Sequence, residues 1–354
     1  MLSIHETRAV DELCRRRRMD PERLRELRNA FYKKHATGEL AIAQLPADVQ
    51  AAFENELRFD FLTLHERADS RIDGASKLIL RTEAGWLIEA VILRLTTGRN
   101  ALCLSSQVGC AVKCSFCATG QMGMAQNLTA SEILDQVVHA NRVLAAEGRR
   151  LRNLVFMGMG EPFHNEEHLQ AAIDVLTDAR SFDFAPERIV VSTVGIPEAM
   201  VRCARQHPRV RMALSLHSAR QAVRESIIPL ARRYRLGELR DAIAEVAAIG
   251  GQRVMIEYLM LADLTDTVDD LRALTDYLTG IPVHINLIPF NPIDDAGELA
   301  SSDRPTREAF AAELKAAGFP VTIRFSLGAD IGAACGQLVK KANRRTLKFD
   351  GAAG

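Results

Sequence analysis

The chain has 354 residues, of which 47% are hydrophobic and 25% charged, and its 45 basic and 45 acidic side chains give a formal net charge of zero. This is the composition of an ordinary globular protein long enough for one large and one smaller domain, and charge alone gives no sign of nucleic-acid binding. No apolar run reaches about eighteen residues and the first residues lack the apolar core of a signal peptide, so we expect a cytoplasmic protein without a membrane span.

Residues 1–70 carry the pattern of helices. Val10 and Leu13 recur at helical spacing, and Asp20-Pro21 is an N-cap followed by proline at the first helical position. Residues 45–48 start another short helix. The sequence therefore predicts a helical accessory domain over residues 1–75, with no chemistry of its own.

From about residue 75 the pattern changes to alternating strands and helices. Six apolar, β-branched runs are typical of buried parallel strands: residues 154–157, 189–194, 210–216, 254–261, 283–288 and 321–325. Amphipathic helices separate them, one opened by the capping box Thr129-x-x-Glu132 and another ended by Gly250. Six such units predict an α/β fold, a partial (β/α)6 barrel over residues 76–325 with its active site at the C-terminal strand ends.

Cys110, Cys114 and Cys117 stand in a C-x3-C-x2-C spacing on one short segment. Three thiolates at this spacing suit a [4Fe–4S] cluster and leave one iron without a protein ligand, which is typical of a catalytic rather than a structural metal site. A zinc site is the main alternative, but it needs a fourth nearby Cys or His, and none follows within about twenty residues. Three cysteines packed as small hydrophobic residues would not explain the spacing.

Polar residues follow the predicted strands at their C-terminal ends. The segment 158–161 ends in Gly160 and Glu161, where a glycine lets a ligand approach the backbone and a carboxylate can hold an ammonium group. The alternative there is a glycine-rich turn with a glutamate that caps a helix. Later strands end in Ser192, in Ser215-Leu216-His217 and in Asn291. We expect Ser192, Ser215, His217 and Asn291 to line one pocket, although each alone is equally a cap or turn residue.

Three more residues stand out along the chain. Cys335 lies among small residues that leave its sulfur accessible, which indicates a reactive thiol or, alternatively, a structural one. Cys103 precedes Cys110 by seven residues and is by composition a buried thiol. Glu89 interrupts the apolar run 86–93, so its carboxylate either has a function or pairs with an arginine such as Arg94 or Arg99.

Together these motifs resemble the radical S-adenosylmethionine superfamily, and within it the RlmN/Cfr family of RNA adenosine methyltransferases. The most specific matching segments are residues 103–110, 156–161, 215–217 and 333–338. The resemblance implies that Cys110, Cys114 and Cys117 bind one [4Fe–4S] cluster. It also implies the residues that contact S-adenosylmethionine: Gly160, Glu161, Ser192, Ser215, Leu216, His217 and Asn291.

The same resemblance assigns the remaining chemistry. Cys335 matches the thiol that becomes S-methylated, Cys103 its partner cysteine and Glu89 a proposed general base. An amidine carbon of adenine is too weak a nucleophile to displace methyl from a sulfonium, so one S-adenosylmethionine methylates Cys335. A second yields a radical that takes hydrogen from the methyl group on that sulfur. Attack of Cys103 on Cys335 then releases the product and leaves a disulfide.

The resemblance further implies an RNA partner, 23S ribosomal RNA with or without transfer RNA, and methylation at adenine carbon 2 or carbon 8. The fourteen-residue step from Glu89 to Cys103 and the residues 117–120 look closer to Cfr-type members, so the carbon stays open. We expect a low-potential electron donor such as flavodoxin, a monomer, and a C-terminal segment over residues 326–354 that carries Cys335 and a basic tail.

Basic runs at residues 15–18, 232–235 and 340–348 permit phosphate contacts, and RNA binding by the accessory domain is one use for them. Two other functions stay open: a zinc-stabilised RNA-binding module without catalysis, and a radical enzyme that acts on a substrate other than RNA.

Overall fold

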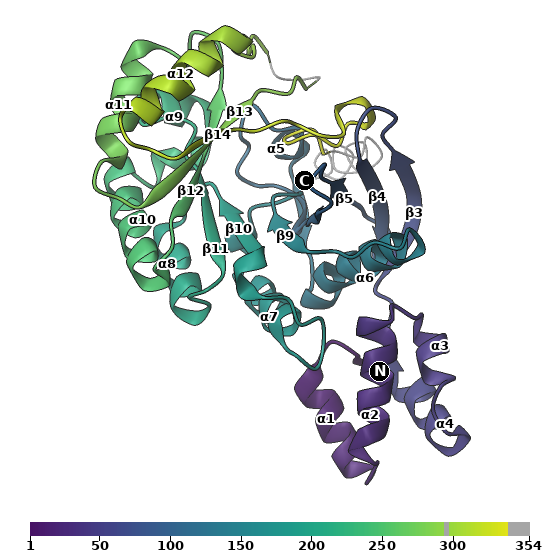
Figure 1. Ribbon diagram of the computed structural model, residues 1–354. Coiled ribbons are helices and arrows are strands. Elements are labelled where there is room, and N and C mark those ends of the chain that lie inside the picture. Colours follow the sequence, from purple (N-terminus) through teal and green to yellow (C-terminus); the bar gives the residue numbers. More distant parts are fainter. Residues whose placement is uncertain (294–296, 339–354) are drawn as a thin grey trace, which may run out of the picture.

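A ten-stranded sheet forms the body of the molecule in the computed structural model, which describes residues 1–293 and 297–338 (Figure 1). The strand order is β14-β13-β12-β11-β10-β9-β6-β5-β4-β3. Seven neighbouring strands are parallel: β6 (Asn100–Cys103), β9 (Asn153–Phe156), β10 (Ile189–Thr193), β11 (Arg211–Ser215), β12 (Val254–Met260), β13 (Val283–Pro289) and β14 (Val321–Ile323). The predicted α/β fold and its six strands are confirmed, and β6 adds a seventh that is too short to stand out as an apolar run.

Three antiparallel strands extend this sheet beyond β6: β5 (Leu87–Arg94), β4 (Ala75–Thr82) and β3 (Leu62–Asp69). The expectation that residues up to 70 are helical is therefore wrong for residues 62–69. Pairing with β4 decides the conformation of this segment, since strand formation depends on neighbouring strands more than on local propensity. β3 is an edge strand with mostly exposed residues, and charged side chains at such an edge hinder pairing with other chains.

Helices cover the outer side of the curved parallel sheet (Figure 1). They are α6 (Ala130–Ala146), α7 (Glu166–Thr177), α8 (Pro197–Gln206), α10 (Leu236–Gly250), α11 (Val268–Leu278) and α12 (Arg304–Ala316). The predicted capping box opens α6, because the Glu132 backbone N–H donates to Thr129 Oγ1 and the Thr129 N–H to the Glu132 carboxylate. In the described chain no helix combines the length and apolar character needed to cross a bilayer.

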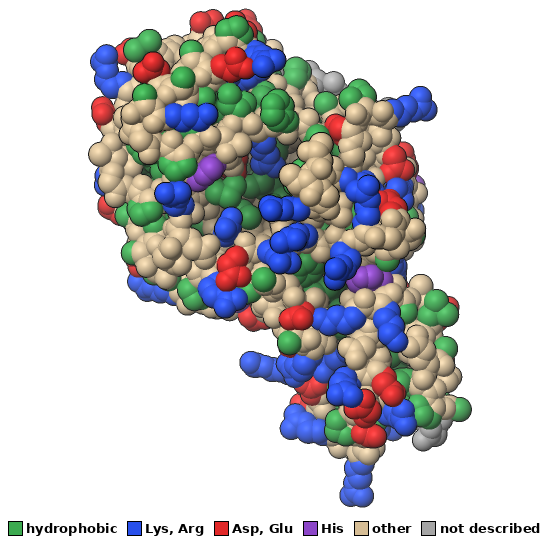
Figure 2. Space-filling view, viewed as in Figure 1, with side chains coloured by type: hydrophobic (Ala, Val, Ile, Leu, Met, Phe, Trp, Pro, Cys, Tyr) green, Lys and Arg blue, Asp and Glu red, His purple; other side chains and the backbone are tan. Residues whose placement is uncertain are grey.

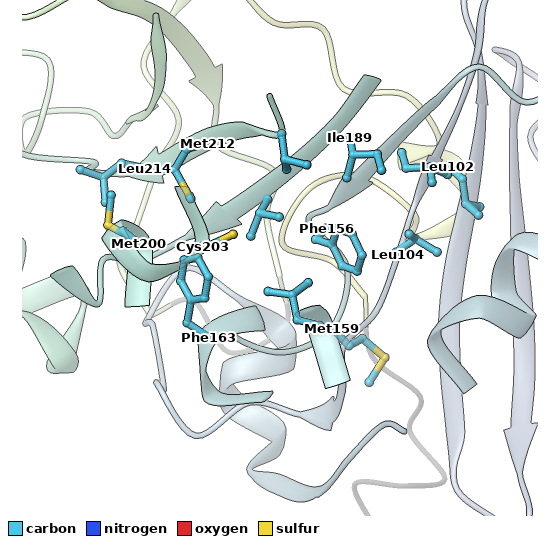
Figure 3. Packing of buried hydrophobic residues seen from close by; sticks show 14 of the residues in the cluster. Leu102, Leu104, Phe156, Met159, Phe163, Ile189, Met200, Cys203, Met212 and Leu214 are labelled. Carbon is cyan, nitrogen blue, oxygen red and sulfur yellow. The ribbon is translucent and has the colours of Figure 1, made fainter. Parts of the chain in front are cut away.

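The main hydrophobic core lies between the sheet and these helices. Figure 3 shows members of this buried cluster, among them Phe156, Ile189, Met159, Phe163, Met200 and Cys203. Phe156 is 1% exposed, so truncating it to alanine would cost about 3–5 kcal/mol through the cavity left behind. Cys203 is buried in this core.

The N-terminal residues form a helical lobe at the lower right of Figure 1, built from α1 (Thr7–Arg16), α2 (Pro21–Arg28), η1 (Asn29–Lys33), α3 (Gly38–Ile42) and α4 (Ala47–Glu56). Asp20 caps α2 as predicted, accepting the Glu22 backbone N–H. The lobe contacts the body where His5 stacks on Phe182, with ring centroids 6.0 Å apart. The domain boundaries at 75 and 325 stay predictions, and the basic residues 340–348 lie outside the described residues.

Candidate active site

A cavity of about 150 Å³ opens at the C-terminal ends of the parallel strands. Its lining brings together ten of the residues singled out in the sequence: Cys110, Cys114, Cys117, Gly160, Glu161, Ser192, Ser215, His217, Asn291 and Cys335. The expectation that the strand-end residues share one pocket is confirmed. We refer to this space as the first cavity.

The three cysteines of the C-x3-C-x2-C motif lie between β7 (Gln107–Gly109) and the short helix α5 (Ala118–Met122). Their segment is anchored to the body, since the Ser115 N–H donates to the Ile227 carbonyl at 3.0 Å. Burial raises the pKa of Cys110 to about 12 and raises the pKa of Cys114 well above its usual value, with the neighbouring thiols adding to both effects. One buried and two half-buried thiols that repel one another as anions favour a cationic metal centre, which supplies the missing positive charge.

The arrangement of these thiols bears on the kind of metal centre that they could hold. Within residues 1–293 and 297–338, no three His, Cys, Asp or Glu side chains are close enough to ligate one metal ion. A tetrahedral zinc site needs four donors around one ion, whereas in a [4Fe–4S] cluster each cysteine binds a different iron. Three thiols around one cavity fit a cluster, in which each cysteine binds a different iron.

The turn after β9 places Glu161 in the first cavity. Gly160 has φ +101°, and a Cβ added there would lie 2.6 Å from the Gln107 Cβ, so only glycine fits. The Glu161 carboxylate accepts the backbone N–H groups of Val194 at 2.9 Å and Phe163 at 3.1 Å. Burial raises its pKa to about 6. The predicted alternatives coexist, because Glu161 caps the short helix at Pro162–Asn165 and also faces the cavity.

His217 packs against the cysteine segment and is held as a neutral ring. Its Nδ1 accepts the Leu259 backbone N–H at 3.1 Å, and its ring meets Phe116 edge-on with centroids 4.8 Å apart. Burial lowers the pKa of His217 to about 3. On the adjacent strand ends, Ser192 Oγ and Ser215 Oγ lie 3.5 Å apart and present two hydroxyl groups to the same space.

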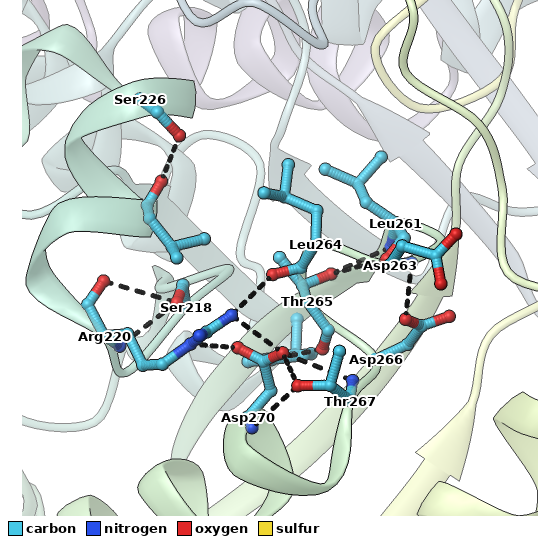
Figure 4. Close-up of polar contacts among 12 residues, drawn as sticks. Ser218, Arg220, Ser226, Leu261, Asp263, Leu264, Thr265, Asp266, Thr267 and Asp270 are labelled. Carbon is cyan, nitrogen blue, oxygen red and sulfur yellow. Dashed lines mark hydrogen bonds and ion pairs between the residues drawn. The ribbon is translucent and has the colours of Figure 1, made fainter.

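Figure 4 shows the polar network that fixes the chain after His217. The Arg220 guanidinium donates to both carboxylate oxygens of Asp270, at 2.7 and 3.1 Å, and to the Leu264 carbonyl at 3.1 Å. Asp270 in turn completes the capping box of α11 with Thr267. This half-buried ion pair ties the segment after β11 to α11 and so positions the His217 side of the cavity.

The segment that carries Cys335 lies against the cysteine motif. Asn291 Nδ2 donates to the Cys335 carbonyl at 3.1 Å, and the Ala118 N–H donates to the Gly336 carbonyl at 2.7 Å. Thr119 Oγ1 donates to the Leu338 carbonyl at 2.5 Å. Residues more than two hundred positions apart are thus joined by direct hydrogen bonds.

A second cavity of about 720 Å³ meets the first. Met157, Arg324, Cys335 and Gly336 line both, and Cys103 lines the second. Burial, together with the nearby Cys335, raises the pKa of Cys103 to about 12, while the Arg324 charge acts in the opposite direction. The two cysteines that the resemblance pairs therefore face a common space.

Two residues assigned from the resemblance do not line either cavity within the described chain. Leu216 is fully buried, and its carbonyl accepts a hydrogen bond from Arg224 Nε at 3.1 Å. Glu89 is 1% exposed and pairs with Lys77 at 3.7 Å. The expectation that Glu89 pairs with an arginine is therefore corrected. Its ion pair is with Lys77 of the neighbouring strand, and Arg94 instead binds Glu147 at 2.7 Å.

Sequence reasoning missed three charged residues near the cavities. Arg324 and Glu257 line the first cavity. Arg224 is 1% exposed and donates to the carbonyls of Leu216 and Val194 at two strand ends. Arg324 and Glu257 fall inside predicted apolar strands, the signal that drew attention to Glu89, so the same criterion would have found them.

Comparison with known proteins agrees with this geometry. Residues 104–278 match the model of the Radical SAM superfamily. The chain is 49% identical to "Probable RNA methyltransferase RB6963" of Rhodopirellula baltica over 97% of its own length and 89% of that protein. It is 38% identical to "Dual-specificity RNA methyltransferase RlmN 1" of Myxococcus xanthus, over 91% of this chain and 90% of that one.

The chain belongs to the RlmN-type family of radical SAM RNA methyltransferases. A crystal structure of a radical SAM methyltransferase from Sphaerobacter thermophilus is similar over 95% of this chain and 97% of that one, with a TM-score of 0.89 and 37% identity. Membership in the radical SAM family means that its cofactors are a [4Fe–4S] cluster and S-adenosylmethionine, which agrees with the three thiols and the strand-end donors of the first cavity.

Proposed function

We propose that this enzyme methylates carbon 2 or carbon 8 of an adenosine in RNA through an S-methylcysteine at Cys335. The observation that carries the proposal is the position of Cys335 between two cavities. One cavity holds the three cysteines of the cluster motif and the strand-end donors, and the other holds Cys103. A thiol between a donor site and an acceptor site is suited to carry a group from one to the other.

In this proposal, the cluster and S-adenosylmethionine supply the methyl group and the radical that activates it. Cys110, Cys114 and Cys117 hold the cluster. The residues that hold S-adenosylmethionine are Gly160, Glu161, Ser192, Ser215, Leu216, His217 and Asn291. Glu161 and Asn291 are fixed by hydrogen bonds to the backbone, so their orientation is set before the ligand binds.

Cys335 and Cys103 have different roles in the transfer of the methyl carbon. The Cys335 sulfur carries the methyl carbon as a thioether and stays bonded to it while that carbon attaches to the base. Attack of the Cys103 thiolate on this sulfur forms an S–S bond and breaks the S–C bond, whose electron pair stays with the product carbon and is protonated. The resulting disulfide is transient, as is typical of catalytic disulfides in a reducing cytoplasm, where we place the enzyme.

Glu89 is the proposed base for the proton that the base carbon loses. Glu89 and Val91 lie on the same face of β5, since side chains alternate along a strand, and Val91 pairs with Cys103 in the sheet. Val91 lines the second cavity. The Glu89 carboxylate lies 3.7 Å from the Lys77 ammonium on the neighbouring strand β4.

RNA is the substrate best supported by the relatives, whose names describe RNA methyltransferases. Figure 2 shows Lys and Arg side chains gathered along the middle of the displayed face, between the body and the N-terminal lobe. Positive charge so placed attracts phosphates on a chain with no net charge. A low-potential electron donor such as flavodoxin and a monomeric enzyme complete the proposal.

Mass spectrometry of RNA treated with the anaerobically purified enzyme tests the proposal, with 23S ribosomal RNA and transfer RNA as separate substrates. We expect a methyladenosine whose fragmentation identifies carbon 2 or carbon 8. Cys335→Ala is expected to abolish it, and Cys103→Ala to leave RNA covalently attached through Cys335. Full product formation by Cys335→Ala would contradict the S-methylcysteine, and a colourless zinc-containing protein would favour the structural alternative.

A further inference from the structure

The second cavity lies where the parallel sheet fails to close. β14 is the last strand of the sheet and pairs with β13 alone among the described strands. The lining comes from both sides of this open seam, residues 322–327 after β13 on one side and β5, β6 and β9 on the other. The seam therefore gives access to Cys335 from the side opposite the cluster motif.

Exposed apolar side chains gather at this seam. Phe325, directly after the shared residue Arg324, is 85% exposed, and Ile72 in the turn between β3 and β4 is 81% exposed. Leu95, after β5, is 38% exposed. All three line the second cavity. An exposed phenylalanine is costly in water, and an exposed apolar patch of this kind commonly marks a binding surface.

Basic residues flank these apolar side chains. Arg71 precedes Ile72 and Arg99 follows Leu95 in the next turn, and both are exposed. Within the described residues neither arginine makes an ion pair with a carboxylate. The acidic residue of the cavity lining, Asp73, is occupied by the backbone N–H groups of Gly328 at 2.7 Å and Ala75 at 2.9 Å. The rim thus offers an aromatic face and free positive charge together.

This combination matches single-stranded nucleic acid, which binds through base stacking on aromatic side chains and phosphate contacts to arginine. An enzyme that modifies a base carbon also needs that base outside the helical stack. We propose that Phe325 is the surface on which the unstacked base of the RNA substrate stacks, and that Arg71 and Arg99 contact the phosphates beside it. The inference deepens the proposed function and rests on it.

The test uses the full-length, cluster-loaded enzyme and two fluorescent RNA hairpins, one with an unpaired adenosine in its loop and one with an abasic site there. Phe325→Ala is expected to weaken binding of the adenosine hairpin about fivefold to a hundredfold, the range for one lost stacked base. Phe325→Trp is expected to restore it. The abasic hairpin is expected to bind equally to all three proteins.

Val268→Ala is the matched control, because Val268 is 71% exposed at the start of α11 and lines neither cavity. Equal affinity of Phe325→Ala and the parent for the adenosine hairpin, or no hairpin binding by the parent, would overturn the inference. S-methylation of Cys335, measured by peptide mass spectrometry without RNA, tests the proposed function separately. We expect it to be unchanged in Phe325→Ala, and its absence from the parent would refute the S-methylcysteine while the hairpin result still decides the role of Phe325.

Discussion

The Arg324 guanidinium lies 3.7 Å from the Glu257 carboxylate, at the boundary where the two cavities meet. Its Nη1 also donates to Met157 Sδ at 3.4 Å. The charge on Cys335 raises the pKa of Arg324 most, and Glu257 and Cys103 act in the same direction. A permanent cation thus faces both cysteines that the proposal uses.

Replacing Arg324 by methionine removes that cation while keeping much of its volume. The pKa of Cys103, which Arg324 lowers, is then expected to rise further, and a rise of about one unit would slow its alkylation about tenfold at pH 8. The measurement is the rate of iodoacetamide labelling against pH, resolved by peptide. Arg324→Lys keeps the charge and serves as the control; equal rates in Arg324→Met and the parent would show that the cation does not act on Cys103.

Gly160→Ala is expected to disturb the hold on Glu161. The new Cβ would meet Gln107, whose side chain accepts the Glu161 backbone N–H at 2.9 Å. Overpacking and the positive φ together would cost about 2–4 kcal/mol of unfolding free energy and weaken S-adenosylmethionine binding. Urea unfolding and calorimetric titration measure the two effects.

Gly85→Ala separates the two causes. Gly85 has φ +87° but no atom within 4 Å of an added Cβ, so this variant carries backbone strain alone and should cost about 1 kcal/mol. Equal losses in Gly85→Ala and Gly160→Ala would argue against the steric contact with Gln107.

Asp330→Ala is expected to loosen the segment that carries Cys335. Asp330 accepts the Ser70 hydroxyl at 2.8 Å and the Arg71 backbone N–H at 3.1 Å, so it ties this segment to the β3–β4 turn. Both bonds are exposed, so global stability should fall by less than about 1 kcal/mol. Hydrogen exchange should be faster in residues 328–336, with Asp330→Asn intermediate because it keeps an acceptor oxygen. Unchanged exchange would mean that other contacts alone hold the segment.

His5 makes folding sensitive to acid. Burial lowers its pKa from 6.5 to about 3, so between these values the unfolded chain binds a proton that the folded chain does not. Stability contributed by the neutral ring is therefore complete above pH 6.5 and is lost as the pH falls toward 3. Urea unfolding at pH 7 and pH 5 should show a smaller loss for His5→Gln than for the parent.

His65→Gln is the control for this measurement, since His65 is exposed on β3. The unfolding free energy of His65→Gln should change between pH 7 and pH 5 by the same amount as that of the parent. A parent-like loss in His5→Gln would assign the acid sensitivity to other groups, among them His217, whose pKa burial also lowers to about 3.

The barrel and the first cavity were within reach of sequence reasoning because their signals are local. Apolar runs located the six parallel strands, and the topology of such strands brings Glu161, Ser192 and Asn291 to one edge. The strand at residues 62–69 and the Lys77 partner of Glu89 were out of reach. Both depend on antiparallel register between segments whose own sequences do not specify each other.

The second cavity was also out of reach, for a geometric reason. It is bounded by the unpaired side of β14 and by strands from the opposite end of the parallel run. The curvature of the sheet, which brings these two sides into proximity, is a collective result of strand twist and helix packing. Neither Phe325 nor Ile72 therefore carries in its local sequence any sign that they share a space.

The contacts that strand β4 and the β3–β4 turn make with the Cys335 segment determine what must be transferred to place a reactive cysteine in another protein. Asp73 accepts the Gly328 N–H, Asp330 accepts Ser70 and Arg71, and Lys77 Nζ donates to the Gly332 carbonyl at 3.2 Å. The position of the Cys335 segment is thus inherited in part from strands outside the parallel barrel. If that segment were grafted onto another barrel of the superfamily, Cys335 would lack the hydrogen bonds that hold its segment in place. The antiparallel strands β3 and β4 would therefore have to be transferred with it.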